Sequence, residues 1–309
     1  MTTRRTALSL LLGSLVLVGT SPAGFAQTPE RMKVVATFSI LGDIVRNVGG
    51  ERTEVTTLVG PNGDAHVYSP TPADGRRLTE AKVVVTNGLR FEGWIDRLMK
   101  SSGTKAAVVE AARGVKPLKG EEDGHGHDHG HGHGGLDPHA WQSVANAKIY
   151  VANIRDALVA ADPAGKAAYE ANAASYLERL DALDKEIRDM VARIPADRRR
   201  IITSHDAFRY FDDAYGIEFV SPQGVSTDAE ASAKDVARII QQIRREKIKA
   251  VFVENVSDPR LMERIAKETG ARIGDRVYSD ALSDENGPAG TYIDMMRHNI
   301  RAFSSALSS

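Results

Sequence analysis

The residues of this chain that could bind a metal ion are concentrated in one short stretch. Six of the nine histidines fall within EEDGHGHDHGHGHGGLDPHAW, Glu121 to Trp141. Five of them alternate with Gly or Asp: His125, His127, His129, His131 and His133. The chain contains no cysteine, which leaves His, Asp and Glu as its strong metal ligands. Two alternatives follow: a metal site within this run, or a site built from histidines that stand alone in the sequence.

Three lone histidines and one aspartate occupy positions where ligands gather. His66 and His205 follow predicted β-strands, the first through a glycine-rich turn, and Asp280 follows another. Asp137 and Pro138 are the predicted N-cap and first residue of a helix, and His139 follows them directly. Ligands collect beyond the carboxyl ends of parallel strands, and two of the four candidates fall in each half of the chain. We therefore expect a site at the interface of the two halves.

Position alone leaves a second interpretation for each candidate, because a single His after a strand is more often a surface or hydrogen-bonded residue. The ninth histidine, His298, lies among polar residues of a predicted helix and is predicted to face solvent. Three imidazoles and one carboxylate would give Zn²⁺ a four-ligand tetrahedral shell. A catalytic zinc usually keeps one position for water, so four protein ligands favour binding over catalysis. Bidentate coordination by Asp280 would also suit Mn²⁺.

Short β-branched runs alternate with helical patterns, which is typical of parallel sheets flanked by helices. The sequence predicts an α/β fold of two lobes, each a roughly four-stranded, mostly parallel sheet flanked by helices, joined by one long rigid helix. The predicted strands are 33–37, 53–59, 82–86 and 105–109, then 200–203, 217–220, 249–253 and 276–278. The predicted domains are a signal peptide over 1–26, a lobe over 27–163 with a His-rich loop at 115–135, the linking helix over 164–194, and a lobe over 195–309.

The first 26 residues are predicted to form a cleavable secretory signal peptide. Arg4 and Arg5 precede an apolar stretch that is too short to span a membrane. The small residues Gly24 and Ala26 then form the signal for cleavage after about Ala26. No cysteine follows, so we expect no membrane anchor, and no later segment has the ~20 apolar residues of a transmembrane helix. With 40 basic and 41 acidic residues, the chain lacks the basic excess typical of nucleic-acid binding. We therefore expect a periplasmic protein with no nucleic-acid partner.

Three motifs are specific when taken together: GDAHVYSP (63–70), DPHAW (137–141) and SHDAFRYF (204–211). With NGLRFEGWIDRL, SPQGVSTDAEASAKD and VFVEN, in this order along essentially the whole mature chain, they resemble the zinc/manganese-type solute-binding proteins of ABC transporters. This is the cluster A-I class, which includes ZnuA and AztC. The resemblance implies two α/β lobes joined by a long helix.

The resemblance also implies that the metal ligands are His66, His139, His205 and Asp280. One departure is that Ala65 stands where the family usually has Pro, which relaxes the turn before His66 but keeps the imidazole. Manganese-type relatives tend to carry Glu at the position of His205. Nitrogen at this position favours Zn²⁺ over the oxygen-preferring Mn²⁺.

The expected function is high-affinity binding of Zn²⁺ between the lobes and its delivery to an inner-membrane ABC permease. We expect a monomer with no catalytic residues, and a periplasmic zinc metallochaperone is a candidate second partner. The alternatives are a manganese-binding protein of the same fold, a zinc hydrolase, and an adhesin. The hydrolase has little support, because the chain has no HExxH, Gly-x-Ser-x-Gly or Walker A motif.

The His-rich run itself has three interpretations: a mobile metal collector, an inert linker, or part of the high-affinity site. Its Gly/His alternation buries almost nothing, and ordering a flexible loop costs ~1–2 kcal/mol per residue. We therefore expect weaker binding here than at a site held by two folded lobes, and favour the collector. Its capture of metal should fade below pH ~6.5, because imidazole must be neutral to bind.

Overall fold

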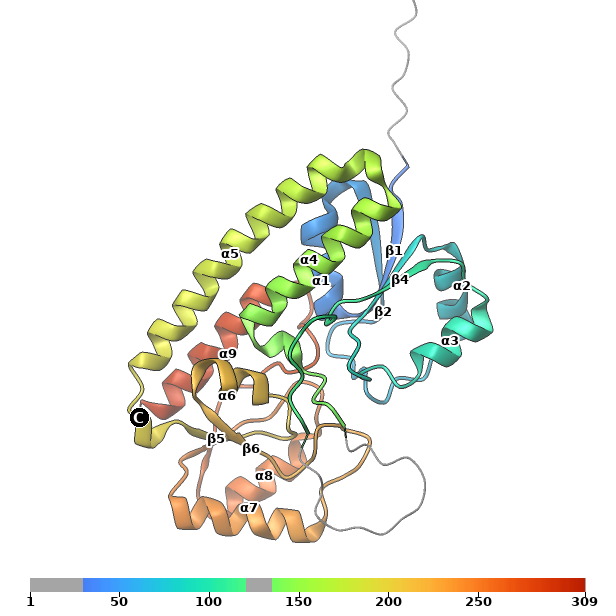
Figure 1. The fold of residues 1–309 in the computed structure, drawn as a ribbon. Coiled ribbons are helices and arrows are strands. Elements are labelled where there is room, and N and C mark those ends of the chain that lie inside the picture. Colours follow the sequence, from blue (N-terminus) through green and yellow to red (C-terminus); the bar gives the residue numbers. More distant parts are fainter. Residues whose placement is uncertain (1–29, 121–134, 309) are drawn as a thin grey trace, which may run out of the picture. The chain divides into compact units, whose positions relative to one another are not determined.

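Two four-stranded parallel sheets organise the described residues, 30–120 and 135–308, of the computed structural model (Figure 1). The first has the order β2-β1-β3-β4, with β1 (Met32–Phe38), β2 (Thr53–Val59), β3 (Val83–Thr86) and β4 (Ala107–Glu110). The second has the order β6-β5-β7-β8, with β5 (Arg200–Ile202), β6 (Glu218–Val220), β7 (Ala250–Val251) and β8 (Arg272–Ile273). All neighbouring strands are parallel. The predicted two-lobed α/β fold is therefore confirmed, while the exact domain boundaries stay a prediction.

Nine α-helices flank these sheets in the described part of the chain. They are α1 (Ser39–Gly49), α2 (Pro72–Glu80), α3 (Ile95–Ser102), α4 (Val144–Ala161), α5 (Lys166–Ala192), α6 (Arg209–Tyr215), α7 (Ala233–Glu246), α8 (Pro259–Thr269) and α9 (Tyr292–Leu307). Three of these helices are N-capped by a side chain that accepts a backbone N–H of the first turn. The capping residues are Ser232 for α7, Asp258 for α8 and Thr291 for α9. Within residues 30–120 and 135–308, no helix is both long and apolar enough to cross a membrane.

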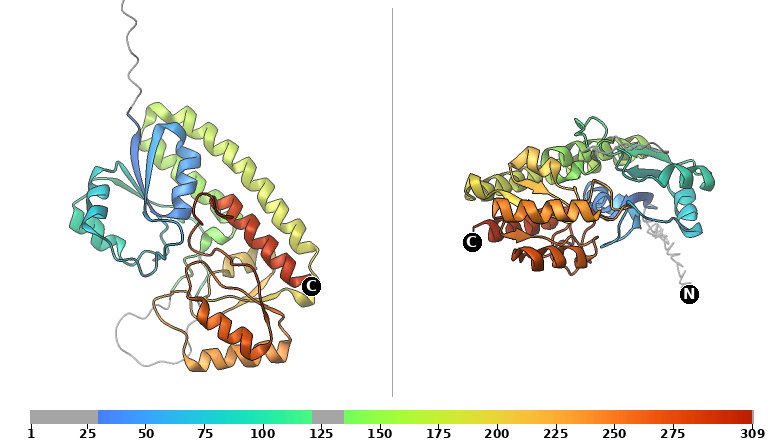
Figure 2. Two further views of the ribbon diagram at one scale, coloured as in Figure 1. Left: turned by 180° about the vertical axis from the view of Figure 1, so that it is seen from behind. Right: turned by 90° about the horizontal axis from the view of Figure 1, so that it is seen from below.

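The long helix α5 connects the two sheets and is fixed along its length by packing. Its 27 residues span about 40 Å at 1.5 Å per residue. Its buried residues recur every three or four positions and so form one stripe: Tyr169, Ala173, Tyr176, Leu180, Leu183, Ile187 and Val191. The helix lies against α1 and α4 of the first lobe and against α9, which follows the second sheet (Figures 1 and 2). The helix therefore belongs to the core and is not a free linker.

The predicted helix start at Asp137-Pro138 is wrong. The chain forms a short 3₁₀ turn at Ala140–Gln142, and α4 begins only at Val144. The reason is that the polar groups of this segment bind elsewhere. Asp137 Oδ1 accepts the backbone N–H of His139, and the side chains of Trp141 and Gln142 both donate to the carbonyl of Ser279 in the second lobe, at 2.8 Å each.

The predicted strand 276–278 is also wrong, because the edge strand is interrupted. The pairing with β7 is made by β8, which ends at Ile273. At Gly274 the chain passes close to Phe252, where an added Cβ would lie 2.4 Å from the ring. The chain then turns, and Val277 resumes the pairing as a single parallel bridge to Glu254. This arrangement places Ser279 and Asp280 beyond the end of the second sheet.

Candidate metal centre

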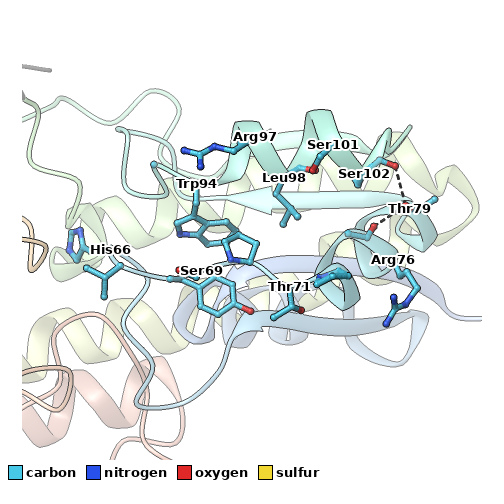
Figure 3. Close-up of a pocket in the computed structure, with 16 residues that line it drawn as sticks. His66, Ser69, Thr71, Arg76, Thr79, Trp94, Arg97, Leu98, Ser101 and Ser102 are labelled. Carbon is cyan, nitrogen blue, oxygen red and sulfur yellow. Dashed lines mark hydrogen bonds between the residues drawn. The ribbon is translucent and has the colours of Figure 1, made fainter. Parts of the chain in front are cut away.

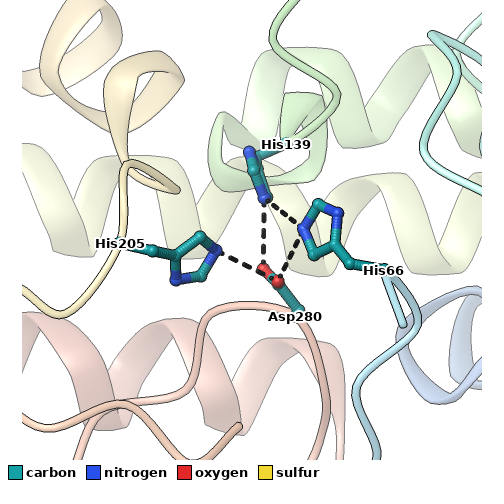
Figure 4. Close-up of side chains that lie close together, drawn as sticks. All are labelled: His66, His139, His205 and Asp280. Carbon is teal, nitrogen blue, oxygen red and sulfur yellow. Dashed lines mark hydrogen bonds and ion pairs between the residues drawn. The ribbon is translucent and has the colours of Figure 1, made fainter. Parts of the chain in front are cut away.

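The four candidate ligands, which lie 66 to 75 residues apart in sequence, meet in space: His66, His139, His205 and Asp280 (Figure 4). Their ligating atoms all lie within 4.8 Å of one another. Asp280 Oδ2 is 3.2 Å from the Nε2 of both His66 and His205, and Asp280 Oδ1 is 3.5 Å from the Nε2 of His139. The Nε2 atoms of His66 and His139 are 3.2 Å apart. All three imidazoles therefore direct Nε2 toward one point beside the carboxylate.

The two parallel sheets bring these residues together because their carboxyl ends face the same region. His66 lies in the loop after β2, and His205 follows β5 by three residues. Asp280 follows the bridge at Val277, and His139 immediately precedes the 3₁₀ turn that leads into α4. Each lobe thus contributes two side chains.

The centre is enclosed by aromatic rings and is almost completely buried. His139, His205 and Asp280 are 0% exposed, and 5% of the His66 side chain is exposed. The Phe91 ring lies edge-on to His66 with centroids 4.7 Å apart, and the Trp141 ring lies edge-on to His139 at 5.3 Å. Because water is excluded, the attraction between a cation and this carboxylate is stronger than at the protein surface.

Two further carboxylates fix the histidine rings, and sequence reasoning missed the role of both. Asp137 Oδ1 lies 2.7 Å from Nδ1 of His139, and Glu254 Oε2 lies 2.5 Å from Nδ1 of His205. A carboxylate at Nδ1 keeps the proton there and leaves Nε2 free for a metal. The Asp-x-His spacing could have revealed Asp137. Nothing local marks Glu254, which is 49 residues from His205.

The buried charges shift the proton affinities of the centre. Burial alone lowers the pKa of His139, but the carboxylates of Asp280 and Asp137 outweigh it and raise this pKa to about 9. At His205, burial is likewise outweighed, by Glu254 and Asp280, and the pKa lies well above its ordinary value. Burial raises the pKa of Asp280, but His205 and His139 together lower it well below its ordinary value. A metal ion must therefore displace protons from this centre in order to bind.

A cavity that reaches His66 does not resemble a cation site. It has a volume of about 880 Å³, lies between α2 and α3, and has His66 at one end (Figure 3). Its charged lining residues are Arg76 and Arg97, and none of the residues that line it is acidic. The arginines would repel a divalent cation, so this cavity is not a candidate cation site.

The five histidines of the dense run, at 125 to 133, lie outside the described residues. The described residues on either side of 121–134 are hydrogen-bonded to each other, because Gly120 N–H donates to the carbonyl of Gly135 at 2.9 Å. The ninth histidine, His298, is on α9, 18 residues after Asp280, and is not one of the clustered residues. It is half-buried instead of simply facing solvent, since its Nε2 lies 2.8 Å from the carbonyl of Arg276 and its ring lies edge-on to Tyr278.

The structure thus shows a two-lobed α/β protein with a candidate metal site, made of three imidazoles and a carboxylate, buried between the lobes. Comparison with protein families reaches the same class. Residues 34–306 match the family model described as "ZnuA: Zinc-uptake complex component A periplasmic". The chain belongs to this family of metal-binding, solute-binding components of ABC transporters, which are not enzymes. It is an extracytoplasmic protein, and its partner is a membrane permease.

Individual relatives carry the names of different metals. The manganese-binding lipoprotein MntA of Halalkalibacterium halodurans is 38% identical over 290 residues, covering 94% of this chain and 93% of MntA. The iron-binding protein YfeA of Yersinia pestis is 36% identical over 295 residues, covering 95% and 91%. Among solved structures, the periplasmic zinc-binding protein TroA of Treponema pallidum has a TM-score of 0.82 at 29% identity, covering 90% of this chain and 99% of TroA.

Proposed function

We propose that His66, His139, His205 and Asp280 bind one divalent transition-metal ion and that this ion is Zn²⁺. The spacing of the ligating atoms carries the proposal. Zinc–nitrogen bonds of ~2.0–2.1 Å place the corners of a tetrahedron about 3.3–3.4 Å apart. Four of the ligand pairs are separated by 3.2, 3.2, 3.2 and 3.5 Å, which is close to this value.

The choice of Zn²⁺ rests on the number of nitrogen ligands. Three imidazoles suit zinc, whereas Mn²⁺ prefers oxygen ligands. Manganese is the second candidate, because the relative MntA is named for it and because the carboxylate of Asp280 could bind through both oxygens. Replacing one nitrogen by oxygen should distinguish the two. We expect His205→Glu to weaken zinc binding and to raise the affinity for manganese relative to zinc, measured by competition titration with both ions.

The proposed cycle is capture of Zn²⁺ outside the cytoplasm and its delivery to the permease. Enclosure by both lobes supports tight capture, and four protein ligands leave no position for the water of a hydrolase. Export through a cleaved leader into the periplasm, the absence of a membrane anchor and a monomeric state remain predictions. Fractionation of expressing cells and light scattering of the processed chain test them. A metallochaperone as zinc donor is also part of this proposal.

The His-rich run is proposed to be an accessory collector that raises the local concentration of zinc. Its support is compositional: the five histidines His125, His127, His129, His131 and His133, with acidic residues beside them. The run ends at His133, six residues before His139 in the sequence. Metal held there would be released close to the centre.

One experiment tests the site and the collector together. Zinc and manganese stoichiometry and affinity are measured for the mature chain, for His205→Ala, for a deletion of residues 124–134, and for His298→Ala as the matched control. We expect His205→Ala to lose tight zinc binding, the deletion to lose only weaker additional zinc, and His298→Ala to bind as the unchanged chain. Loss of tight binding in the deletion, with retention in His205→Ala, would show the assignment to be wrong.

A further inference from the structure

The three histidines of the centre are not held in the same way. The rings of His139 and His205 each face a carboxylate at Nδ1. Among the described residues, no carboxylate contacts Nδ1 of His66, and its ring touches Asp280 only through Nε2. His66 is also the one candidate ligand with any exposed surface. Of the three imidazoles, it is therefore the one least fixed by its own lobe.

The turn that carries His66 is instead tied to the other lobe. Asp64 Oδ1 accepts the backbone N–H of His66 at 2.9 Å, and Asp64 Oδ2 accepts a hydrogen bond from Thr227 Oγ1 at 2.6 Å. Thr227 is 163 residues away, in the irregular segment 221–232 between β6 and α7. The carboxylate of Asp64 thus joins the backbone of one candidate ligand to a side chain of the second lobe.

The same segment contacts the loop that carries His205. The Asp206 N–H donates to the carbonyl of Gly224 at 3.1 Å, and the Gln223 N–H donates to the carbonyl of Ser204 at 3.4 Å. Residues 223–227 therefore bind both neighbours of His205 and, through Asp64, the turn of His66. A shift of this segment would disturb one candidate ligand from each lobe. This segment forms part of the motif SPQGVSTDAEASAKD, to which the metal centre itself assigns no role.

We propose that Thr227 is a positioning residue for metal binding, which acts through Asp64 to hold His66 over the centre. The inference rests on the proposed function, because it takes His66 as a ligand. While the Thr227–Asp64 hydrogen bond is intact, the His66 turn is fixed to both lobes and the metal remains enclosed. When segment 221–232 moves away, His66 is the ligand that is freed first. Metal release is thereby coupled to this segment.

The test is the rate at which zinc leaves the protein, measured with Zn²⁺-loaded mature chain and excess of a chromogenic chelator. Thr227→Val keeps the shape of the side chain but removes the donor, and we expect dissociation to be about 10-fold faster. Thr227→Ser restores the hydroxyl and should restore the slow rate. Thr269→Val on α8, where the hydroxyl donates to the carbonyl of Ile265, is the matched control and should release zinc at the original rate.

Two further measurements separate this role from a general loss of stability and from a failure of the site itself. The melting temperature of metal-free Thr227→Val should match that of the Thr269→Val control. In an Asp64→Ala background, Thr227→Val should have little further effect, because both changes remove the same hydrogen bond. An unchanged dissociation rate in Thr227→Val, while His66→Ala loses tight binding, overturns the positioning role alone. Tight binding that survives His66→Ala overturns both the positioning role and the proposed site.

Discussion

Replacing Glu254 by Gln tests how the centre selects the metal-binding nitrogen of His205. Glu254 is fully buried and contacts His205 twice: Oε1 accepts its backbone N–H at 2.9 Å, and Oε2 lies 2.5 Å from ring Nδ1. A glutamine offers one acceptor and one donor in the same space. In either amide orientation, the NH₂ group faces one of the two N–H groups of His205. If it faces the ring, His205 must move its proton to Nε2, the atom that should bind the metal.

The expected loss of affinity follows from that mismatch. A buried donor left without an acceptor costs about 1–3 kcal/mol, which corresponds to about 5- to 140-fold weaker binding at 1.4 kcal/mol per tenfold. This range agrees with the usual effect of removing a partner of a ligating histidine. Zinc affinity is measured by competition with a chelator of known affinity, and nitrogen NMR reports which ring nitrogen of His205 carries the proton.

A matched control separates the local effect from a change in overall charge. Glu80→Gln removes a surface carboxylate that pairs with Lys33 at 2.8 Å, and we expect it to leave zinc affinity unchanged. If Glu254→Gln binds zinc as tightly as Glu80→Gln does, the proposed orientation of His205 by Glu254 is refuted.

Three other predictions concern pH and packing. In the metal-free centre the pKa of His139 is about 9 and that of His205 lies well above its ordinary value, so zinc must displace protons to bind. Between pH 8 and pH 6, zinc affinity should therefore fall roughly tenfold per pH unit for each proton displaced. A flat pH profile in competition titrations would contradict this. The raised pKa of His139 stabilises the metal-free fold fully at pH values below about 6.5, the pKa of histidine in the unfolded chain, and progressively less as pH rises through about 9. The melting temperature of the metal-free protein should therefore fall over this pH range. The same fall in the Asp280→Asn variant would argue against the carboxylate as its cause. Gly165→Ala should destabilise the fold by about 1–3 kcal/mol without changing zinc affinity, because the new Cβ would lie 2.4–2.6 Å from side-chain atoms of Arg52, Asp162 and Tyr169. Thermal unfolding measures the destabilisation. An unchanged melting temperature would show that these three side chains can move to accept the methyl group.

Much of the fold follows from local sequence patterns. The alternation of β-branched runs and helical stretches predicts both sheets, and the gap between Gly165 and Pro195 predicts the long helix, observed as Lys166–Ala192. The errors occur where long-range contacts override a local signal. Asp137-Pro138 looks like a helix start, but its carboxylate is used by His139, and the chain stays irregular until Val144.

The candidate ligands show the same division. The positions of His66, His139, His205 and Asp280 after predicted strands or at a predicted helix start made them candidates, and the family resemblance implied that they form one ligand set. The run of five histidines has no such signal, since its Gly/His pattern specifies no strand or helix.

The sequence by itself therefore determined which residue types could bind a metal, at which ends of the strands they lie, and that no thiolate competes with them. Only the tertiary structure decided what holds those residues in place. Glu254 reaches His205 across 49 residues, and Thr227 reaches Asp64 across 163. The physical reason is that a residue's ability to bind a metal depends on its own side chain, which the sequence states directly. The orientation of each ring depends on carboxylate and hydroxyl partners that only the packing of two lobes brings within hydrogen-bonding distance.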